Sequence, residues 1–155
     1  IACIAQLVNV IAPILTEKGG RVLKQTIYYP FQMISKYFRG KTALHLFKDI
    51  ESYDTVTYGK APKIYSTCAY DEKENAYVLL LINVNDTEEE VELSLDHECR
   101  LTKEIIYQSD DVHVQNTFDK PFEIVPLEKD IKNDAIFMKK ALKLRKNSIG
   151  LFIIK

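Results

Sequence analysis

The sequence predicts a mainly β protein, built as an antiparallel sandwich or barrel that follows a short strand, loop and helix. Beyond about Gly40, nearly every segment either alternates polar and apolar residues or forms a short apolar run. Turn signals rich in Asp, Asn and Glu separate these segments at roughly regular spacing, which is typical of all-β domains. No segment with helical periodicity interrupts them, so a parallel α/β sheet is not expected there.

The chain opens with IACIAQLVNVIAPILTE. Residues 1–5 are apolar on both faces, which predicts a strand that other elements cover on both sides. Two amides, Gln6 and Asn9, follow at once. A strand of this kind belongs inside a protein, so we expect it to be part of a larger arrangement of elements.

A helix is expected over residues 26–38, in TIYYPFQMISKYF. The apolar residues that share one face at helical spacing are Ile27, Phe31, Ile34 and Phe38. Thr26 can act as the N-cap, which puts Pro30 in or near the first turn, where proline costs least. Gly40 suits the position just after the helix. A helix this rich in aromatic residues needs a broad apolar partner.

The rest of the chain predicts short strands separated by turns. The strand candidates are residues 42–47, 64–70, 76–83, 90–95, 100–108, 122–127, 135–138, 141–144 and 148–154. The turn candidates are residues 71–75, 85–87, 96–98, 109–111, 129–130 and 132–134. The run VLLLIN at 78–83 is apolar on both faces and is expected at the centre of a sheet. The triplet at 85–87 also fits a glycosylation signal, but a turn is the better interpretation.

These elements divide the chain into two parts. Residues 1–40 supply one strand, a loop and one helix, and such a pair cannot bury its apolar faces alone. We therefore expect residues 1–40 to be the end of a larger α/β domain and residues 41–155 to form the β domain.

Charge and composition exclude several classes of partner and site. Lys and Arg number 21 against 22 Asp and Glu, for a net charge of −1, so neither nucleic acid nor a membrane surface is an expected partner. No apolar stretch approaches the roughly 20 residues that a membrane span needs. Three scattered cysteines predict buried, reduced thiols. Three histidines lack ligand spacing, so neither a metal nor a cofactor is expected.

No acidic residue stands in a setting that suggests a catalytic role. The acidic groups considered are Glu88, Glu89, Glu90, Asp110, Asp111 and Glu17. All fall in predicted turns or loops, where a solvated carboxylate is the expected state and a pKa raised into the range of a general acid is not.

Two blocks of sequence carry a family resemblance. The string IACIAQLVNVIAPILTEKGG followed by KQTIYYPFQMISKYFRG resembles the end of the barrel in glycoside hydrolase family 51 α-L-arabinofuranosidases. The resemblance continues through SYDTVTYGKAPKI and the pattern Asp110-Asp111…Asn116-Thr117…Pro121. It departs from the family at Leu23 and Ile149, where tryptophan is usual.

The resemblance implies a (β/α)8 barrel followed by a jelly-roll-like β-sandwich. Residues 1–40 would be the last strand, loop and helix of a truncated barrel, and residues 41–155 the C-terminal sandwich. The family hydrolyses terminal α-L-arabinofuranosyl residues of arabinan- and arabinoxylan-type saccharides with retention. Both catalytic glutamates belong to earlier barrel strands, so no catalytic residue is expected in this chain, which alone should be inactive.

The resemblance also assigns one substrate-binding residue, Gln6. Barrel active sites lie at the C-terminal ends of the strands, and an amide both donates to and accepts from sugar hydroxyls. Asn9 is expected to be structural, tying its loop to its surroundings. The implied partners are arabinose-containing saccharides, the missing barrel and, for the parent enzyme, further copies of itself; the implied compartment is the cytoplasm.

A different function remains open from the residues themselves. An autonomous carbohydrate-binding β-sandwich could use an aromatic platform instead of a barrel. The tyrosines considered for it are Tyr53, Tyr58, Tyr65, Tyr70, Tyr77 and Tyr107. Tyrosine is equally common as a half-buried strand residue with a wet hydroxyl, so packing is the competing interpretation.

Overall fold

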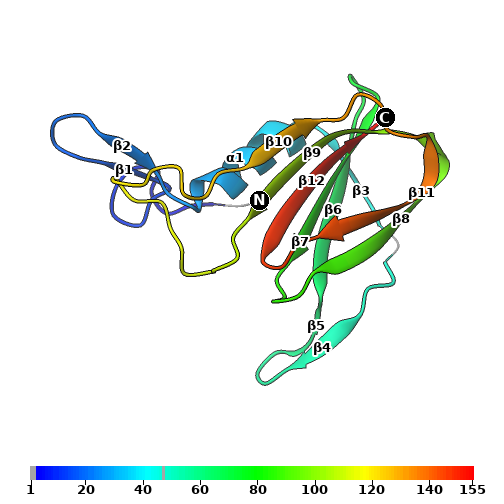
Figure 1. Ribbon diagram of the computed structural model, residues 1–155, viewed down its shortest axis with the longest axis horizontal. Coiled ribbons are helices and arrows are strands. Elements are labelled where there is room, and N and C mark those ends of the chain that lie inside the picture. The colour runs from blue at the N-terminus through cyan, green and yellow to red at the C-terminus, as the bar shows by residue number, and fades with distance from the viewer. Residues whose placement is uncertain (1–2, 47) are drawn as a thin grey trace.

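The computed structural model describes residues 3–46 and 48–155 and is a mainly β, sandwich-like fold with one short helix (Figure 1). The helix α1 spans Tyr28–Phe38. The strands are β1 (Ile14–Thr16), β2 (Val22–Lys24), β3 (Thr42–Leu44), β4 (Ser52–Thr55), β5 (Gly59–Pro62), β6 (Ile64–Asp71), β7 (Ala76–Asn83), β8 (Glu89–Cys99), β9 (Leu101–Gln108), β10 (Leu127–Asp130), β11 (Phe137–Leu144) and β12 (Ser148–Ile154).

A six-stranded antiparallel sheet forms the main layer, in the order β10-β9-β12-β7-β6-β3. The β8–β11 pair packs across one face of it, and the core between them contains side chains from both layers. Along β7, Leu79 and Leu81 point into this core, whereas Val78 and Leu80 point to the opposite face. The prediction that residues 78–83 are central is confirmed, because β7 lies between β12 and β6 with both faces covered.

Helix α1 covers the other face of the six-stranded sheet (Figure 1). Its buried residues are Tyr29, Met33 and Tyr37, which recur every four positions. The expected packing face was therefore wrong: Ile27, Phe31 and Ile34 of the predicted stripe are exposed, and Phe38 is only partly buried. The helix has two apolar faces, and periodicity alone cannot tell which one the sheet will cover.

The helix ends follow the sequence in part. The N-cap position is Ile27, without a side-chain cap, so the prediction for Thr26 was wrong. The carbonyl of Thr26 instead accepts a hydrogen bond from the Tyr107 hydroxyl at 2.8 Å. Gly40 follows the helix with φ of 73°, which confirms its expected role, since a left-handed residue there suits glycine.

Some strand boundaries differ from the predicted ones, because hydrogen bonding to a neighbouring strand, and not the apolar residues of the segment itself, determines where the strand forms. Residues 1–2 of the predicted strand 1–5 lie outside the described residues, and Cys3–Ala5 are not a strand: no β-bridge to residues 3–5 occurs within the described ranges. Residues 122–127 were expected as a strand, but the edge strand is β10, which includes the predicted turn at 129–130. Polar β10 forms because β9 offers a free edge to pair with.

Other differences concern strand length and short hairpins. Strand β8 runs straight through the predicted turn at 96–98, and the two candidates at 135–144 form the single strand β11 with an irregularity. The hairpins β1–β2 and β4–β5 were not predicted, since strands of three or four residues give too little alternation to detect.

Buried amide side chains fasten the loops to the sandwich. Asn83 is 1% exposed, and its amide donates to the carbonyls of Thr87, Leu144 and Arg145 at 2.8, 3.3 and 3.0 Å. Its oxygen accepts from the Asn85 backbone at 3.0 Å. This network holds residues 85–87 as the link between β7 and β8, so the turn interpretation is confirmed.

An ion pair joins the end of the helix to the sandwich. Lys41 contacts Asp71 at the end of β6, and both side chains are only 15% exposed. The hydrogen bond from Lys41 lowers the pKa of Asp71, against the opposing effect of partial burial. Backbone N–H groups of Lys73 and Glu74 donate to the same carboxylate at 3.1 and 3.3 Å.

Replacing Asp71 should make stability less dependent on pH. Because the folded pKa of Asp71 lies below its unfolded value of about 4, its charge stabilises the fold above that value and ceases to do so as pH falls through the folded pKa. Asp71→Asn should therefore be less stable than the wild type at neutral pH and approach it in acid, as measured by urea unfolding from neutral pH to about pH 3. Asp54→Asn on the exposed β4 is the control, and a pH-independent difference for Asp71→Asn would contradict the prediction.

The choice of helix face can be tested with neighbouring residues. Met33→Ala empties part of the core beneath α1 and should cost about 2–5 kcal/mol of unfolding free energy. Ile34→Ala, on the exposed face, should cost less than about 1 kcal/mol. Urea denaturation of this chain measures both, and equal losses would show that the buried face has been misassigned.

Candidate functional site

The predicted sugar-binding residue Gln6 lies in the exposed segment before β1. Its neighbours Ile4 and Leu7 line one side of a groove of about 660 Å³, and α1 lines the other. The remaining lining residues are Pro13, Tyr28, Phe31, Gln32, Ser35 and Lys36. Gln6 itself is exposed and is not among the residues that line the groove, although two residues close to it in sequence are.

Asn9 fixes this segment to the β1–β2 hairpin, as the sequence predicted. Its amide donates to the Thr16 hydroxyl at 2.9 Å, and its oxygen accepts from the Thr16 backbone at 2.7 Å. The Asn9 backbone N–H donates to the Ile14 carbonyl at 2.7 Å, and Val8 forms a parallel bridge with Ile14. The structural role expected for Asn9 is confirmed.

The backbone just after Gln6 is strained. Asn9 and Val10 have φ angles of 58° and 57°, in the left-handed region. Asparagine tolerates this region, but a β-branched residue such as Val10 does not, at a cost of about 1–3 kcal/mol. The Asn9 hydrogen bonds hold the chain there, and strain of this kind is concentrated at sites where a side chain must be aimed.

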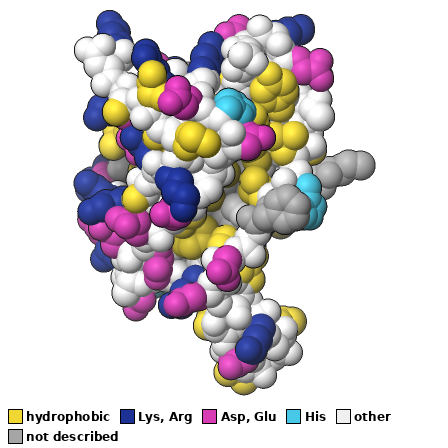
Figure 2. Space-filling view, turned by 90° about the vertical axis from the view of Figure 1, so that its right-hand side faces the viewer, with side chains coloured by type: hydrophobic (Ala, Val, Ile, Leu, Met, Phe, Trp, Pro, Cys, Tyr) yellow, Lys and Arg dark blue, Asp and Glu magenta, His cyan; other side chains and the backbone are white. Residues whose placement is uncertain are grey.

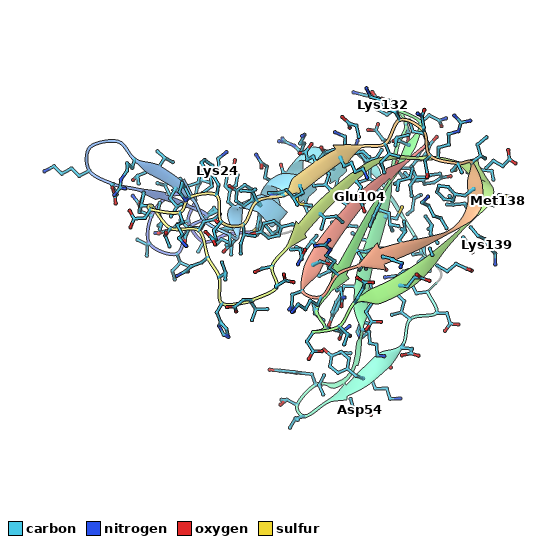
Figure 3. The ribbon with its side chains drawn as sticks, viewed as in Figure 1. Lys24, Asp54, Glu104, Lys132, Met138 and Lys139 are labelled. Atoms are coloured by element: carbon cyan, nitrogen blue, oxygen red, sulfur yellow. The ribbon has the colours of Figure 1, made fainter. Side chains whose placement is uncertain are left out.

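The hairpin is in turn held by the sandwich (Figure 1). Asn116, in the long loop between β9 and β10, is 5% exposed and donates to the carbonyls of Lys24 and Ile124 at 3.3 and 3.0 Å. Figure 3 labels Lys24 on this hairpin, beside the loop. Tyr107 donates to Thr26 from β9, and burial raises the pKa of Tyr107 to about 12, which keeps its hydroxyl protonated as a donor.

The tip of the hairpin contacts the same loop through Arg21. The guanidinium pairs with Glu17 at 2.6 Å and lies over the Phe118 ring, 5.2 Å from its centroid. The hydrogen bond that Arg21 donates to Glu17 raises the pKa of Arg21. Asp119 lies 3.7 Å from Arg21, so the loop supplies both an aromatic face and a charge to the hairpin tip.

The acidic residues considered from the sequence lie in turns and loops, except that Glu89 and Glu90 begin strand β8, so the turn prediction was wrong for these two. Glu88, Glu90, Asp110 and Asp111 are exposed, whereas Glu89 and Glu17 are partly exposed. In the described part of the chain, every carboxyl group with a shifted pKa is shifted downward by a hydrogen-bonding partner. Such groups stay ionised and suit ion pairs, whereas a general acid needs a raised pKa.

Cysteines and possible metal ligands were also located. Cys68 and Cys99 are buried free thiols, as predicted, and burial raises the pKa of Cys68 to about 11. Cys3 is exposed, so the expectation of burial was wrong for this residue. Across residues 3–46 and 48–155, no three His, Cys, Asp or Glu side chains group as metal ligands.

The six tyrosines considered as a platform lie on different surfaces. Tyr77 packs against the core beneath β8–β11, with the Tyr70 ring centroid 5.3 Å away, whereas Tyr107 packs on the opposite face against Tyr29. Tyr53 and Tyr58 are exposed in the β4–β5 hairpin, the lower projection in Figure 2. The packing interpretation is therefore confirmed for Tyr70, Tyr77 and Tyr107. Sugar binding by the exposed tyrosines, Tyr53, Tyr58 and Tyr65, stays a prediction.

Sequence reasoning singled out Gln6 and Asn9 but not the residues that hold the β1–β2 hairpin next to them. Asn116 was noted only as part of a family pattern, and Tyr107 only as one tyrosine of six. The signal for Asn116 was weak, because a loop asparagine usually marks a turn and nothing local reveals that its amide is buried.

A sandwich-like β domain with this lead-in segment is the fold found at the C-terminal side of certain glycoside hydrolases. A family 51 α-L-arabinofuranosidase from Bifidobacterium longum matches with a TM-score of 0.82 and 28% identity, over 97% of this chain and 30% of that one. Residues 1–148 match the family described as the α-L-arabinofuranosidase C-terminal domain. The chain belongs to that family.

Two curated relatives resemble the chain over most of its length. An intracellular exo-α-(1→5)-L-arabinofuranosidase from Bacillus subtilis is 34% identical over 128 residues, which is 81% of this chain and 25% of that protein. A protein of the same description from Streptomyces lividans is 35% identical over 129 residues, which is 81% of this chain and 19% of that protein. The chain therefore spans a quarter or less of the length of these relatives.

Proposed function

We propose that the chain is the C-terminal part of a retaining α-L-arabinofuranosidase. The parent enzyme would hydrolyse terminal α-L-arabinofuranosyl residues of arabinan- and arabinoxylan-type saccharides. The observation that carries this proposal is the match of residues 1–148 to the C-terminal domain family of these enzymes. The names of the two curated relatives, both exo-acting arabinofuranosidases, support it.

In this proposal residues 1–40 close a (β/α)8 barrel and residues 41–155 form the sandwich that supports it. The apolar residues 1–5 would find their hydrogen-bonding partners in neighbouring barrel strands. The exposed face of α1, with Ile27, Phe31 and Ile34, would be covered by the barrel. The exposed apolar residues of α1 support a partner with a broad apolar surface on this face.

Gln6 would then stand at the C-terminal end of the last barrel strand, where such barrels hold substrate. Its amide would donate to one sugar hydroxyl and accept from another, and it stays neutral at any working pH. Retaining hydrolysis needs two carboxyl groups about 5–5.5 Å apart, one as nucleophile and one as acid and base. The proposal places both glutamates in the parent enzyme ahead of this chain, so this chain supplies binding and support.

The proposed location follows the names of the relatives, whereas the proposed assembly comes from the family resemblance alone. Both curated relatives are named intracellular, which supports a cytoplasmic parent enzyme. We also infer that the parent is a homo-oligomer. In the described residues no helix is long and apolar enough to cross a membrane.

The role of Gln6 is tested in the full-length protein that carries this chain, assayed with a chromogenic α-L-arabinofuranoside. Gln6→Ala should lower kcat/KM by about 10- to 100-fold, because hydrogen bonds to a buried sugar are lost. Asn133→Ala, at an exposed amide in the loop before β11, is the control and should leave kcat/KM unchanged. The 155-residue chain alone should show no turnover. Unchanged kinetics for Gln6→Ala, or hydrolysis by the chain alone, would overturn the assignment.

The proposal that a barrel covers the exposed face of α1 is tested with the double variant Phe31→Gln/Ile34→Gln in two settings. In this chain alone both residues are exposed, so the unfolding free energy should change by less than about 1 kcal/mol and self-association measured by light scattering should fall. In the full-length protein the same changes should cost about 3 kcal/mol or more, since two large side chains leave an apolar interface. Equal effects in both settings would argue against a barrel on this face.

A further inference from the structure

We propose that Asn116 of the sandwich is a positioning residue for Gln6. The inference rests on the proposed function, because it assigns to the sandwich a part in sugar binding beyond support. The loop between β9 and β10 holds the β1–β2 hairpin, and the hairpin in turn sets the position of the segment that carries Gln6.

The first link joins the Gln6 segment to β1. Asn9 makes two hydrogen bonds with Thr16, at 2.9 and 2.7 Å, and Val8 bridges to Ile14. Only Leu7 separates Gln6 from this bridged part of the chain. A displacement of β1 should therefore also displace Gln6, because only one residue lies between Gln6 and the bridge at Val8.

The second link joins the hairpin to the sandwich. Strand β1 pairs with β2 through only three residue pairs, of which Ile14 with Lys24 is one. An isolated hairpin of this length is not stable in water. At that pair, the Lys24 carbonyl accepts from Asn116, a residue 92 positions further along the chain.

Asn116 is itself held firmly enough to act as an anchor. Its oxygen accepts from the Ile124 N–H at 2.8 Å, and its amide donates to the Ile124 carbonyl at 3.0 Å. These reciprocal bonds fix both ends of the amide group, which is buried. The remaining amide hydrogen therefore points to the Lys24 carbonyl. Asn116 thus joins the loop between β9 and β10 to the hairpin to which the Gln6 segment is bonded.

The expected consequence is kinetic. Without Asn116 the hairpin loses its hydrogen bond to the β9–β10 loop and can shift, and the Gln6 segment, which Asn9 ties to that hairpin, shifts with it. Gln6 would then occupy its binding position for only a fraction of the time, which weakens apparent substrate affinity by the same fraction. The chemical step, carried by groups elsewhere in the parent enzyme, should change less.

The test compares two buried asparagines in the full-length protein. Asn116→Ala should raise KM for the chromogenic arabinofuranoside by roughly tenfold, with a smaller change in kcat. Asn83→Ala is the matched control: it also removes a buried amide that bonds loop carbonyls, but it lies at the β7–β8 link. Both variants should lower Tm, and only Asn116→Ala should change KM at a temperature well below either transition.

A double-mutant cycle with Gln6→Ala separates positioning from general damage. If Asn116 acts through Gln6, Asn116→Ala should have little further effect on kcat/KM in the Gln6→Ala background. Additive effects, or an equal rise in KM for Asn83→Ala, would overturn the proposal. If Asn116→Ala does not fold, Asn9→Gly removes both side-chain hydrogen bonds of the first link at a residue whose φ of 58° glycine tolerates, and an unchanged KM would overturn the proposal equally. An inactive wild-type enzyme would instead refute the proposed function.

Discussion

The central strand β7 is covered on both faces, and the rest of the structure depends on this double burial. Leu79 and Leu81 lie under the β8–β11 layer, while Val78 and Leu80 lie under α1. Neither layer can be removed without exposing one of these pairs to water. The helix is therefore a structural layer of the β domain even though it precedes the sandwich in sequence, and the groove beside Gln6 exists because α1 is held in that place.

Asparagine side chains connect this packed centre to the loops. Asn83 fastens the β7–β8 link, Asn116 fastens the β1–β2 hairpin to the long loop, and Asn9 fastens the segment that carries Gln6 to that hairpin. In each case one amide side chain forms a hydrogen bond with a backbone group of another segment and so joins a loop to a strand or hairpin. The irregular parts of the protein are thus ordered by a few polar contacts, whereas the sheets are ordered by apolar burial.

The sequence was a good guide where burial determines structure and a poor one where tertiary pairing does. The bounds of β7 and β12 match the predicted 76–83 and 148–154, because both strands are apolar on two faces. The packing face of α1 was missed, since Tyr29, Met33 and Tyr37 compete with a second stripe of equal quality. Strand β10 was missed because its four residues are all exposed and only the edge of β9 makes them a strand. Gln6 could be named only through resemblance, and Asn116 acquires a role only once distant segments are seen together.

The two apolar faces of α1 mean that the division after residue 40 does not separate two independent units. One face completes the hydrophobic layer beneath β7 and β12, and the other, with Phe31 and Ile34, faces outward. A fragment trimmed to begin at Lys41 would lose the helix that covers one face of its own sheet and would expose Val78 and Leu80. The interior of the β domain therefore extends to α1, so any shortened version of this chain should retain the helix.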